Sequence, residues 1–162
     1  MWLVAQTPPG AVLPRSEPDL ALVHGDFGLA NLVWQGDSIV DVLDWETAHI
    51  GDPVFDLAWI CMGALNDDDL VMGLVTKEVF VEMYRKATGR PVETTVLLWW
   101  QVAAAWVRGC TEARLLDLAA TNSKEGATLD VRDLLWEFEN IHTETELLGL
   151  IKQHDQLVAR GL

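Results

Sequence analysis

Three side chains that could handle a proton or a metal ion lie close together in the sequence: Asp26, Asn31 and Asp44. Asp26 and Asn31 form an Asp-x-x-x-x-Asn interval, which is the spacing found in catalytic loops for phosphoryl transfer. In such a loop the aspartate accepts the proton of the substrate hydroxyl, and the asparagine binds magnesium. Magnesium prefers hard oxygen ligands and usually takes only one or two from the protein. The three residues therefore predict phosphoryl-transfer chemistry.

A β-hairpin is the element that would bring Asn31 and Asp44 together. Asn31–Trp34 and Ser38–Leu43 are rich in residues that favour strands, and Gln35-Gly36-Asp37 joins them with residues that tolerate left-handed turns. Asn31 would open the first strand and Asp44 would follow the second. Because a hairpin returns both ends to one edge, one magnesium ion could contact both residues.

Four linked motifs extend from about Leu22 to Trp59, namely His24-Gly25-Asp26, Asp44-Trp45-Glu46, Gly51-Asp52-Pro53 and Asp56-Leu57-Ala58. In this order and spacing the stretch resembles the aminoglycoside phosphotransferase and choline kinase group, whose members share a protein-kinase-like fold. Within that group it is most similar to phosphotransferase domains found fused to acyl-CoA dehydrogenases.

The resemblance implies a role for each of the three site residues. Asp26 would be the catalytic base or would orient the acceptor hydroxyl, and Asn31 and Asp44 would bind ATP (or GTP) with Mg²⁺. The alternative for each residue taken singly is a local hydrogen bond in a turn or at a strand end.

The other motif residues are expected to support this loop. We expect His24 to be a buried, hydrogen-bonded brace, Asp52 to be a helix N-cap with Pro53 in the first helical position, and Asp56 to hydrogen-bond back to the loop. Phe27 and Trp45 are expected to pack, whereas Glu46 is either a metal or substrate contact or a solvated carboxylate.

The resemblance also predicts the division of the chain. Only 23 residues precede His24, and they contain no lysine and no repeated-glycine loop of the kind that covers ATP phosphates. We expect an α+β, mostly helical fold that corresponds to the C-terminal lobe of a protein-kinase-like fold. Residues 1–19 would be an irregular lead-in, 20–52 the catalytic loop, hairpin and metal loop, and 53–162 a helical substrate-side subdomain. The N-terminal nucleotide lobe is expected to be absent and supplied by a longer chain or by a partner.

Composition limits the class of protein. The 162-residue chain is 50% hydrophobic, enough for one domain with a real core. Its net charge of −14 argues against nucleic acid and anionic membranes, because phosphate backbones need basic patches. The start, Met1–Ala5, lacks the basic head and long apolar stretch of a signal peptide, and no run reaches the length of a membrane span. We expect a cytoplasmic protein with no nucleic-acid or membrane partner.

Beyond the motifs the pattern is helical. Helices are expected over Pro53–Leu65, Leu70–Val75, Thr76–Thr88, Val92–Ala120 and parts of Leu129–Leu157, with a loop over Thr121–Gly126. The apolar stripe Val54, Leu57, Ala58 and Cys61 should pack against the hairpin, and Trp99, Trp100 and Trp106 should lie in the core. Cys61 and Cys110 have no CxxC spacing, so we expect both to be reduced and buried.

Taken together, the sequence predicts an ATP-dependent small-molecule kinase that transfers the γ-phosphoryl group to a hydroxyl of a small-molecule acceptor. The alternative is a non-catalytic kinase-like binding module or an inactive remnant. A metal-dependent phosphohydrolase is less well supported, because the His/Asp cluster of a two-metal site is missing from the sequence.

Overall fold

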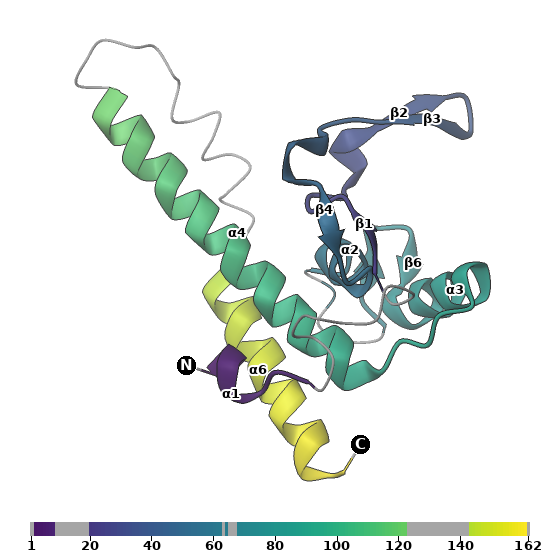
Figure 1. Cartoon of the computed structure of the whole chain (residues 1–162), viewed down its shortest axis with the longest axis vertical. Coiled ribbons are helices and arrows are strands. Elements are labelled where there is room, and N and C mark those ends of the chain that lie inside the picture. Colours follow the sequence, from purple (N-terminus) through teal and green to yellow (C-terminus); the bar gives the residue numbers. More distant parts are fainter. Residues whose placement is uncertain (1, 9–19, 63, 65–67, 123–142, 162) are drawn as a thin grey trace.

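The computed structural model describes residues 2–8, 20–62, 64, 68–122 and 143–161. Within these ranges it is a mixed α/β structure, mostly helical, with three separate two-stranded antiparallel sheets. Figure 1 shows the strands near the catalytic-loop sequence on one side of the long helix α4 (Thr94–Asn122), and the last helix, α6 (Thr143–Ala159), alongside its lower half. The coarse prediction of a mainly helical α+β fold is confirmed.

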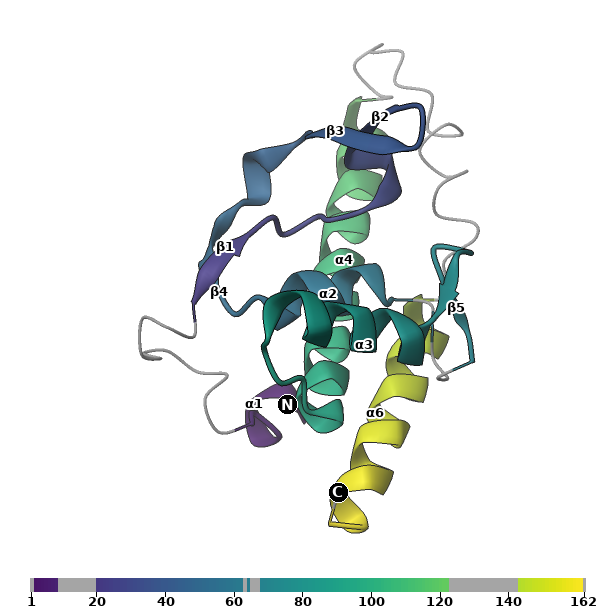
Figure 2. The ribbon, with the colours of Figure 1, turned by 90° about the vertical axis from the view of Figure 1, so that its right-hand side faces the viewer.

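Two of the sheets flank the catalytic-loop sequence. Strand β1 (Ala21–Val23) pairs with β4 (His49–Gly51). Strands β2 (Leu32–Gln35) and β3 (Ser38–Val42) form the predicted hairpin. Gly36 has φ +60° in its turn, a conformation that glycine adopts without steric cost. Figures 1 and 2 show this hairpin projecting away from the helices.

Helix α2 (Val54–Ile60) forms the centre of the core, but it does not bury its stripe against the hairpin. The buried face of α2 consists of Val54, Leu57 and Ala58. It packs against Val81 of α3 (Lys77–Thr88), Leu97 of α4 and Val92 in the turn between those helices. The predicted contact with the hairpin is therefore wrong. The long helix offers a broad apolar surface, whereas most side chains of the two-stranded hairpin remain exposed. The helix also ends at Ile60, before the predicted Leu65.

Residues 70–76 form a small hairpin where Leu70–Val75 was expected to be helical. Strands β5 (Leu70–Val71) and β6 (Val75–Thr76) pair across a turn in which Met72 and Gly73 have positive φ values of 54° and 72°. Six residues are too few for a stable helix, and the left-handed conformation of Gly73 favours a turn.

The boundaries of α3 follow its capping residues, as predicted. The Thr76 side chain accepts a hydrogen bond from the Val79 amide at 3.4 Å, and Gly89 ends the helix with φ +68°. Helix α4 extends through Thr121 and Asn122, where a loop was expected. Residues 123–142 lie outside the described residues, and they include the rest of the expected loop and the first part of the helical segment expected in Leu129–Leu157.

The start of the chain is partly helical instead of wholly irregular. Helix α1 (Trp2–Ala5) packs beside α6, where Trp2 and Leu3 contact a cluster formed by Leu98, Val102 and Leu150. The Trp99 Nε1 group donates to the Leu3 carbonyl at 3.1 Å. These contacts fix the position of α1 against α4 and α6.

Two predictions of burial in α4 are also wrong. Trp106 is 56% exposed and Cys110 is exposed, although Trp99 and Cys61 are buried as expected. A helix this long passes beyond the part of the core that its neighbours α2 and α6 cover among the described residues. No helix within the described ranges is long and apolar enough to cross a membrane.

Candidate active site

The catalytic-loop sequence is held in place by one carboxylate from α2. Asp56 Oδ2 accepts a hydrogen bond from the His24 amide at 2.7 Å, and Asp56 Oδ1 accepts one from the Gly25 amide at 2.9 Å. The two bonds use both carboxylate oxygens. They join positions that are 32 and 31 residues apart in the sequence. The predicted hydrogen bonding of Asp56 to the loop is confirmed, and α2 therefore fixes where the loop begins.

His24 braces the loop from inside. It is 2% exposed, and its Nε2 lies 2.8 Å from the Leu43 carbonyl oxygen, which can only accept. Its Nδ1 accepts from the Asp26 amide at 3.2 Å. These two partners assign a neutral imidazole with the proton on Nε2. The Trp45 and Phe27 rings contact the imidazole, with centroids at 4.7 and 5.9 Å. The predicted bracing role is confirmed.

Gly25 occupies a position that excludes larger residues. Its φ is +87°, and a Cβ built on it would lie 2.8 Å from both the carbonyl oxygen and the Oγ1 of Thr47. Thr47 Oγ1 donates to the His24 carbonyl at 2.8 Å, so Thr47 is also part of the support. Sequence reasoning missed Thr47, because nothing in its spacing indicates that it folds back onto the loop.

Asp26 and Asn31 are in direct contact. The Asn31 Nδ2 group donates to the Asp26 carbonyl at 2.8 Å and to Asp26 Oδ2 at 3.1 Å. These two bonds place the Nδ2 group of the Asn31 amide toward Asp26. Among the described residues, Asn31 Oδ1 and Asp26 Oδ1 have no hydrogen-bond partner. Each therefore keeps an oxygen available, one as a metal ligand and one as a hydrogen-bond acceptor.

Asp44 follows the other end of the hairpin. The Leu43 amide donates to the Asn31 carbonyl at 2.7 Å, so the residue before Asp44 pairs directly with Asn31. Asp44 has φ 62° and ψ 58°, a left-handed conformation that aspartate tolerates better than most residues. Its exposed carboxylate makes no hydrogen bond to any described residue. The predicted hairpin thus brings the backbones at Asn31 and Asp44 together, while no described contact joins their side chains.

The donor set suits a hard cation with few protein ligands. Within the described residues there is no group of three or more His, Cys, Asp or Glu side chains that could hold a metal ion. An amide oxygen and one carboxylate, both without a partner in the part of the chain that the structure describes, match magnesium, which keeps most of its positions for phosphate and water.

Asp52 connects α2 to α4. Its Oδ1 accepts from the amide of Val54, the first residue of α2, at 3.0 Å. The N-cap of α2 is Pro53, so the prediction of Asp52 as the N-cap with Pro53 in the first helical position is wrong by one residue. Asp52 Oδ2 accepts from Trp100 Nε1 at 2.8 Å. This tie to Trp100 was not predicted, because a tryptophan in an apolar helix gives no sequence signal of a polar partner. Glu46 is exposed in the short helix Trp45–Thr47.

Comparison with known proteins agrees with the resemblance of the motifs. Acyl-CoA dehydrogenase family member 10 of Mus musculus is 34% identical over 93 residues, which are 49% of this chain and 9% of that protein. Acyl-CoA dehydrogenase family member 11 of Mus musculus is 42% identical over 52 residues, 31% of this chain and 7% of that protein. Probable acyl-CoA dehydrogenase IBR3 of Arabidopsis thaliana is 29% identical over 86 residues, 43% of this chain and 10% of that protein.

The chain spans a tenth or less of the length of these relatives. No solved structure matches it significantly. The sequence model of the phosphotransferase enzyme family matches residues 2–96, which include every residue of the loop, the hairpin and α2. The chain therefore belongs to the phosphotransferase enzyme family.

Proposed function

We propose that this chain provides the catalytic and metal-binding part of an ATP-dependent kinase that phosphorylates a hydroxyl group of a small molecule. The observation that carries the proposal is the direct bond between Asn31 and Asp26, which leaves one oxygen of each without a described partner. Asp44 follows the second strand of the hairpin, and its carboxylate also has no hydrogen-bond partner among the described residues.

In this proposal each residue has one task. Asp26 receives a hydrogen bond from the acceptor hydroxyl and takes its proton as the oxygen attacks the γ-phosphorus. The bond from that phosphorus to the β–γ bridging oxygen breaks, and ADP leaves. Asn31 and Asp44 hold Mg²⁺ with the nucleotide phosphates. When bound, the ion neutralises phosphate charge. Because the transition state of such a transfer is loose, the residues contribute mainly by positioning the hydroxyl and the phosphates.

The supporting residues explain how the geometry would be kept. Asp56 fixes the loop backbone, and His24 joins the loop to Leu43, the residue next to Asp44. The loop and the metal-binding end of the hairpin are thus connected through one imidazole. We propose that residues 20–52 form this catalytic part and 53–162 the acceptor side of a kinase-like C-terminal lobe, with the nucleotide clamp contributed by another polypeptide segment.

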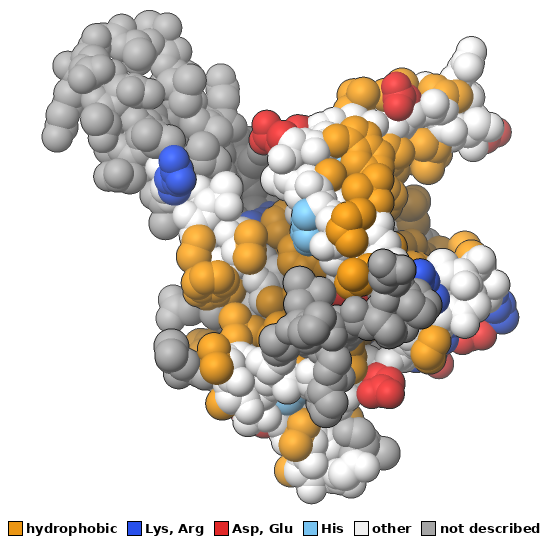
Figure 3. All heavy atoms as spheres, viewed as in Figure 1, with side chains coloured by type: hydrophobic (Ala, Val, Ile, Leu, Met, Phe, Trp, Pro, Cys, Tyr) orange, Lys and Arg blue, Asp and Glu red, His pale blue; other side chains and the backbone are white. Residues whose placement is uncertain are grey.

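A non-catalytic binding module is the second candidate, and the exposed apolar side chains favour it. Figure 3 shows hydrophobic side chains gathered over the β1–β4 pair and the adjoining hairpin. Large apolar residues there are 48–63% exposed, namely Leu22, Ile39, Val40, Leu43 and Ile50. An apolar surface of this kind is typical of an interface.

Calorimetric titration with Mg–ATP distinguishes the two candidates. We expect binding that requires magnesium, is lost in Asp44→Ala and is retained in Asp37→Ala, a matched acid at the exposed hairpin turn. Circular dichroism of each variant checks folding. Equal binding by Asp44→Ala would contradict the metal role, and absence of nucleotide binding by the folded chain would favour the binding module.

Turnover tests the role of Asp26 in any preparation that phosphorylates an acceptor. Asp26→Asn should retain Mg–ATP binding, because the new amide oxygen can still accept the hydrogen bond from Asn31. It should lose phosphoryl transfer, because an amide does not accept the hydroxyl proton; the expected loss is about 10²-fold or more in kcat. Transfer at the wild-type rate would remove Asp26 from the mechanism.

A further inference from the structure

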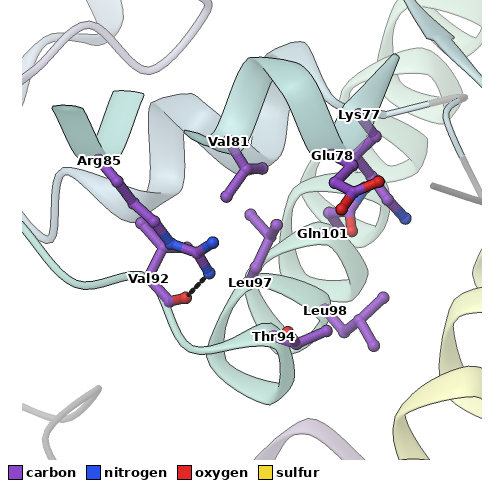
Figure 4. Close-up of a pocket in the computed structure, with 9 residues that line it drawn as sticks. All are labelled: Lys77, Glu78, Val81, Arg85, Val92, Thr94, Leu97, Leu98 and Gln101. Carbon is purple, nitrogen blue, oxygen red and sulfur yellow. Dashed lines mark hydrogen bonds between the residues drawn. The ribbon is translucent and has the colours of Figure 1, made fainter. Parts of the chain in front are cut away.

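A separate pocket lies between α3 and the start of α4, away from the catalytic loop. Its volume is about 220 Å³, several times the roughly 30 Å³ that one water molecule occupies in the liquid. Helix α2 separates the pocket from the loop, because Asp56 on α2 binds the loop while Leu57 packs with the pocket residues Val81 and Leu97. Figure 4 shows the residues that line it.

One end of the pocket contains a buried hydrogen-bond acceptor without a donor. Gln101 is 0% exposed, and its Nε2 donates to the Cys61 carbonyl at 2.8 Å. Its Oε1 has no hydrogen-bond partner among the described residues, and Gln101 lines the same pocket. An unpaired buried amide oxygen is costly, so this position favours a ligand group that donates a hydrogen bond.

The charged residues at this end of the pocket indicate which kind of ligand group could donate to Gln101. Lys77 is 6% exposed and lines the same end, where Figure 4 draws it beside Glu78 and Gln101. Burial raises the pKa of the Cys61 thiol, and the positive charge of Lys77 lowers it, as expected for an ammonium group close to that thiol. Lys77 and Glu78 carry opposite charges at this end, so a neutral hydroxyl suits Gln101 better than a charged donor.

The other end favours an anion. Arg85 extends over the turn before α4 and donates from Nη2 to the Val92 carbonyl. Its Nη1 lies 3.7 Å from Glu82 Oε2, a loose ion pair that leaves guanidinium donors for a ligand anion. Thr94 is the first residue of α4, whose first-turn amides lack partners within the helix. Glu78, the one carboxylate lining the pocket, lies at the opposite end. Seven residues of helix separate Thr94 from Gln101, which is about 10 Å.

We propose that this pocket binds a small hydroxy-carboxylate whose two polar groups are about 10 Å apart along a hydrocarbon chain. The carboxylate contacts Arg85 and Thr94, the hydroxyl donates to Gln101 Oε1, and the chain packs against the apolar floor, formed by Val81, Val92, Leu97 and Leu98. The proposal does not depend on the proposed kinase activity, since it uses none of the residues of the catalytic loop.

Titration of the full chain with 8-hydroxyoctanoate and octanoate tests both ends of the site. We expect the hydroxylated probe to bind about tenfold more tightly, the effect of one well-placed hydrogen bond. Gln101→Met should make the two affinities equal. The ratio of the two affinities is measured within one variant, so a general loss of stability does not imitate this result.

Arg85→Gln keeps the proposal testable if Gln101→Met fails to fold. It should weaken both probes by about tenfold or more, as expected for loss of a charged hydrogen bond. Lys86→Gln is the matched control, because Lys86 lies next to Arg85 but 75% of its side chain is exposed and it does not line the pocket. It should leave both affinities unchanged.

Amide chemical shifts measured by NMR locate the bound probe. Shifts confined to residues 77–101 support the pocket, whereas shifts at residues 24–31 alone would overturn it. Equal affinities of the two probes for the wild-type chain, or no binding of either at millimolar concentration, would also overturn the proposal and leave Gln101 Oε1 to water.

Discussion

Gly25 is constrained by its backbone conformation and by the space around its Cα atom. Gly25 and Gly36 both have positive φ, of 87° and 60°, but only Gly25 faces a close neighbour. Gly36→Ala should therefore cost about 1–2 kcal/mol, which is the left-handed penalty of a residue with a Cβ. Gly25→Ala adds the contact with Thr47 and should cost about 3 kcal/mol or more.

Urea unfolding of the two glycine variants measures this difference. Equal destabilisation would mean that Thr47 moves aside without cost. The roles of Asp26 and Asn31 are predicted from their types and spacing, because the chemistry of phosphoryl transfer dictates both. Thr47 was not predicted, since its contact with His24 depends on how the chain returns from the hairpin.

Cys61 gives the molecule a pH dependence of known sign. Burial raises the pKa of its thiol from 9.0 to about 12, and Lys77 partly opposes this. Between those values the unfolded chain loses the thiol proton while the folded chain keeps it, so stability should fall as pH rises above 9. The loss from this residue should approach about 1 kcal/mol per pH unit.

Comparison with Cys61→Ala isolates the contribution of that thiol. The variant has its own fixed cost from the lost side chain, but its stability should decline less steeply between pH 9 and 10.5. Parallel curves for the two proteins would show that Cys61 does not contribute. Cys110 is exposed, so it serves as an internal control that thiol reagents should modify in the folded state.

Elements whose ends carry their own signals were predictable, and elements defined by their partners were not. Thr76 and Gly89 set the limits of α3, and Gly36-Asp37 set the hairpin, so both followed from sequence. The apolar periodicity of α2 correctly gave its buried face. It could not indicate which element would cover that face, because any apolar surface satisfies the same pattern.

The bond between Trp100 and Asp52 is a tie between α2 and α4 that can be measured. Trp100→Phe keeps an aromatic ring but removes the donor to the buried Asp52 carboxylate, so it should destabilise the chain by about 2 kcal/mol. Trp106→Phe is the matched control on the same helix, and at an exposed position it should cost no more than about 0.5 kcal/mol.

A double-mutant cycle with Asp52→Ala shows whether that loss comes from the bond itself. A coupling energy near zero between Trp100→Phe and Asp52→Ala would attribute the loss to packing of the indole and not to the hydrogen bond. Because Asp52 also accepts a hydrogen bond from the first amide of α2, the same cycle reports how strongly the helix that supports the loop depends on α4.

Over the whole molecule, a net charge of −14 means that acidic side chains repel one another, so a simple salt should stabilise the chain. Sodium acts by screening repulsion among the acidic side chains, with a Debye length of about 10 Å at 0.1 M ionic strength. A general increase in thermal stability with salt therefore says nothing about a metal site. The size of this general salt effect has to be measured before an effect of magnesium on stability can be assigned to Asn31 and Asp44.

Magnesium chloride should stabilise the wild-type chain more than sodium chloride of equal ionic strength. Binding to the folded state alone adds RT ln(1 + [Mg²⁺]/Kd), about 1.4 kcal/mol when the concentration is ten times Kd. This excess should disappear in Asp44→Ala and persist in Asp37→Ala, while the sodium effect remains in both. Since each excess is a difference within one variant, the backbone strain of alanine at φ 62° cancels. An undiminished excess in Asp44→Ala would assign the magnesium effect to the acidic surface as a whole.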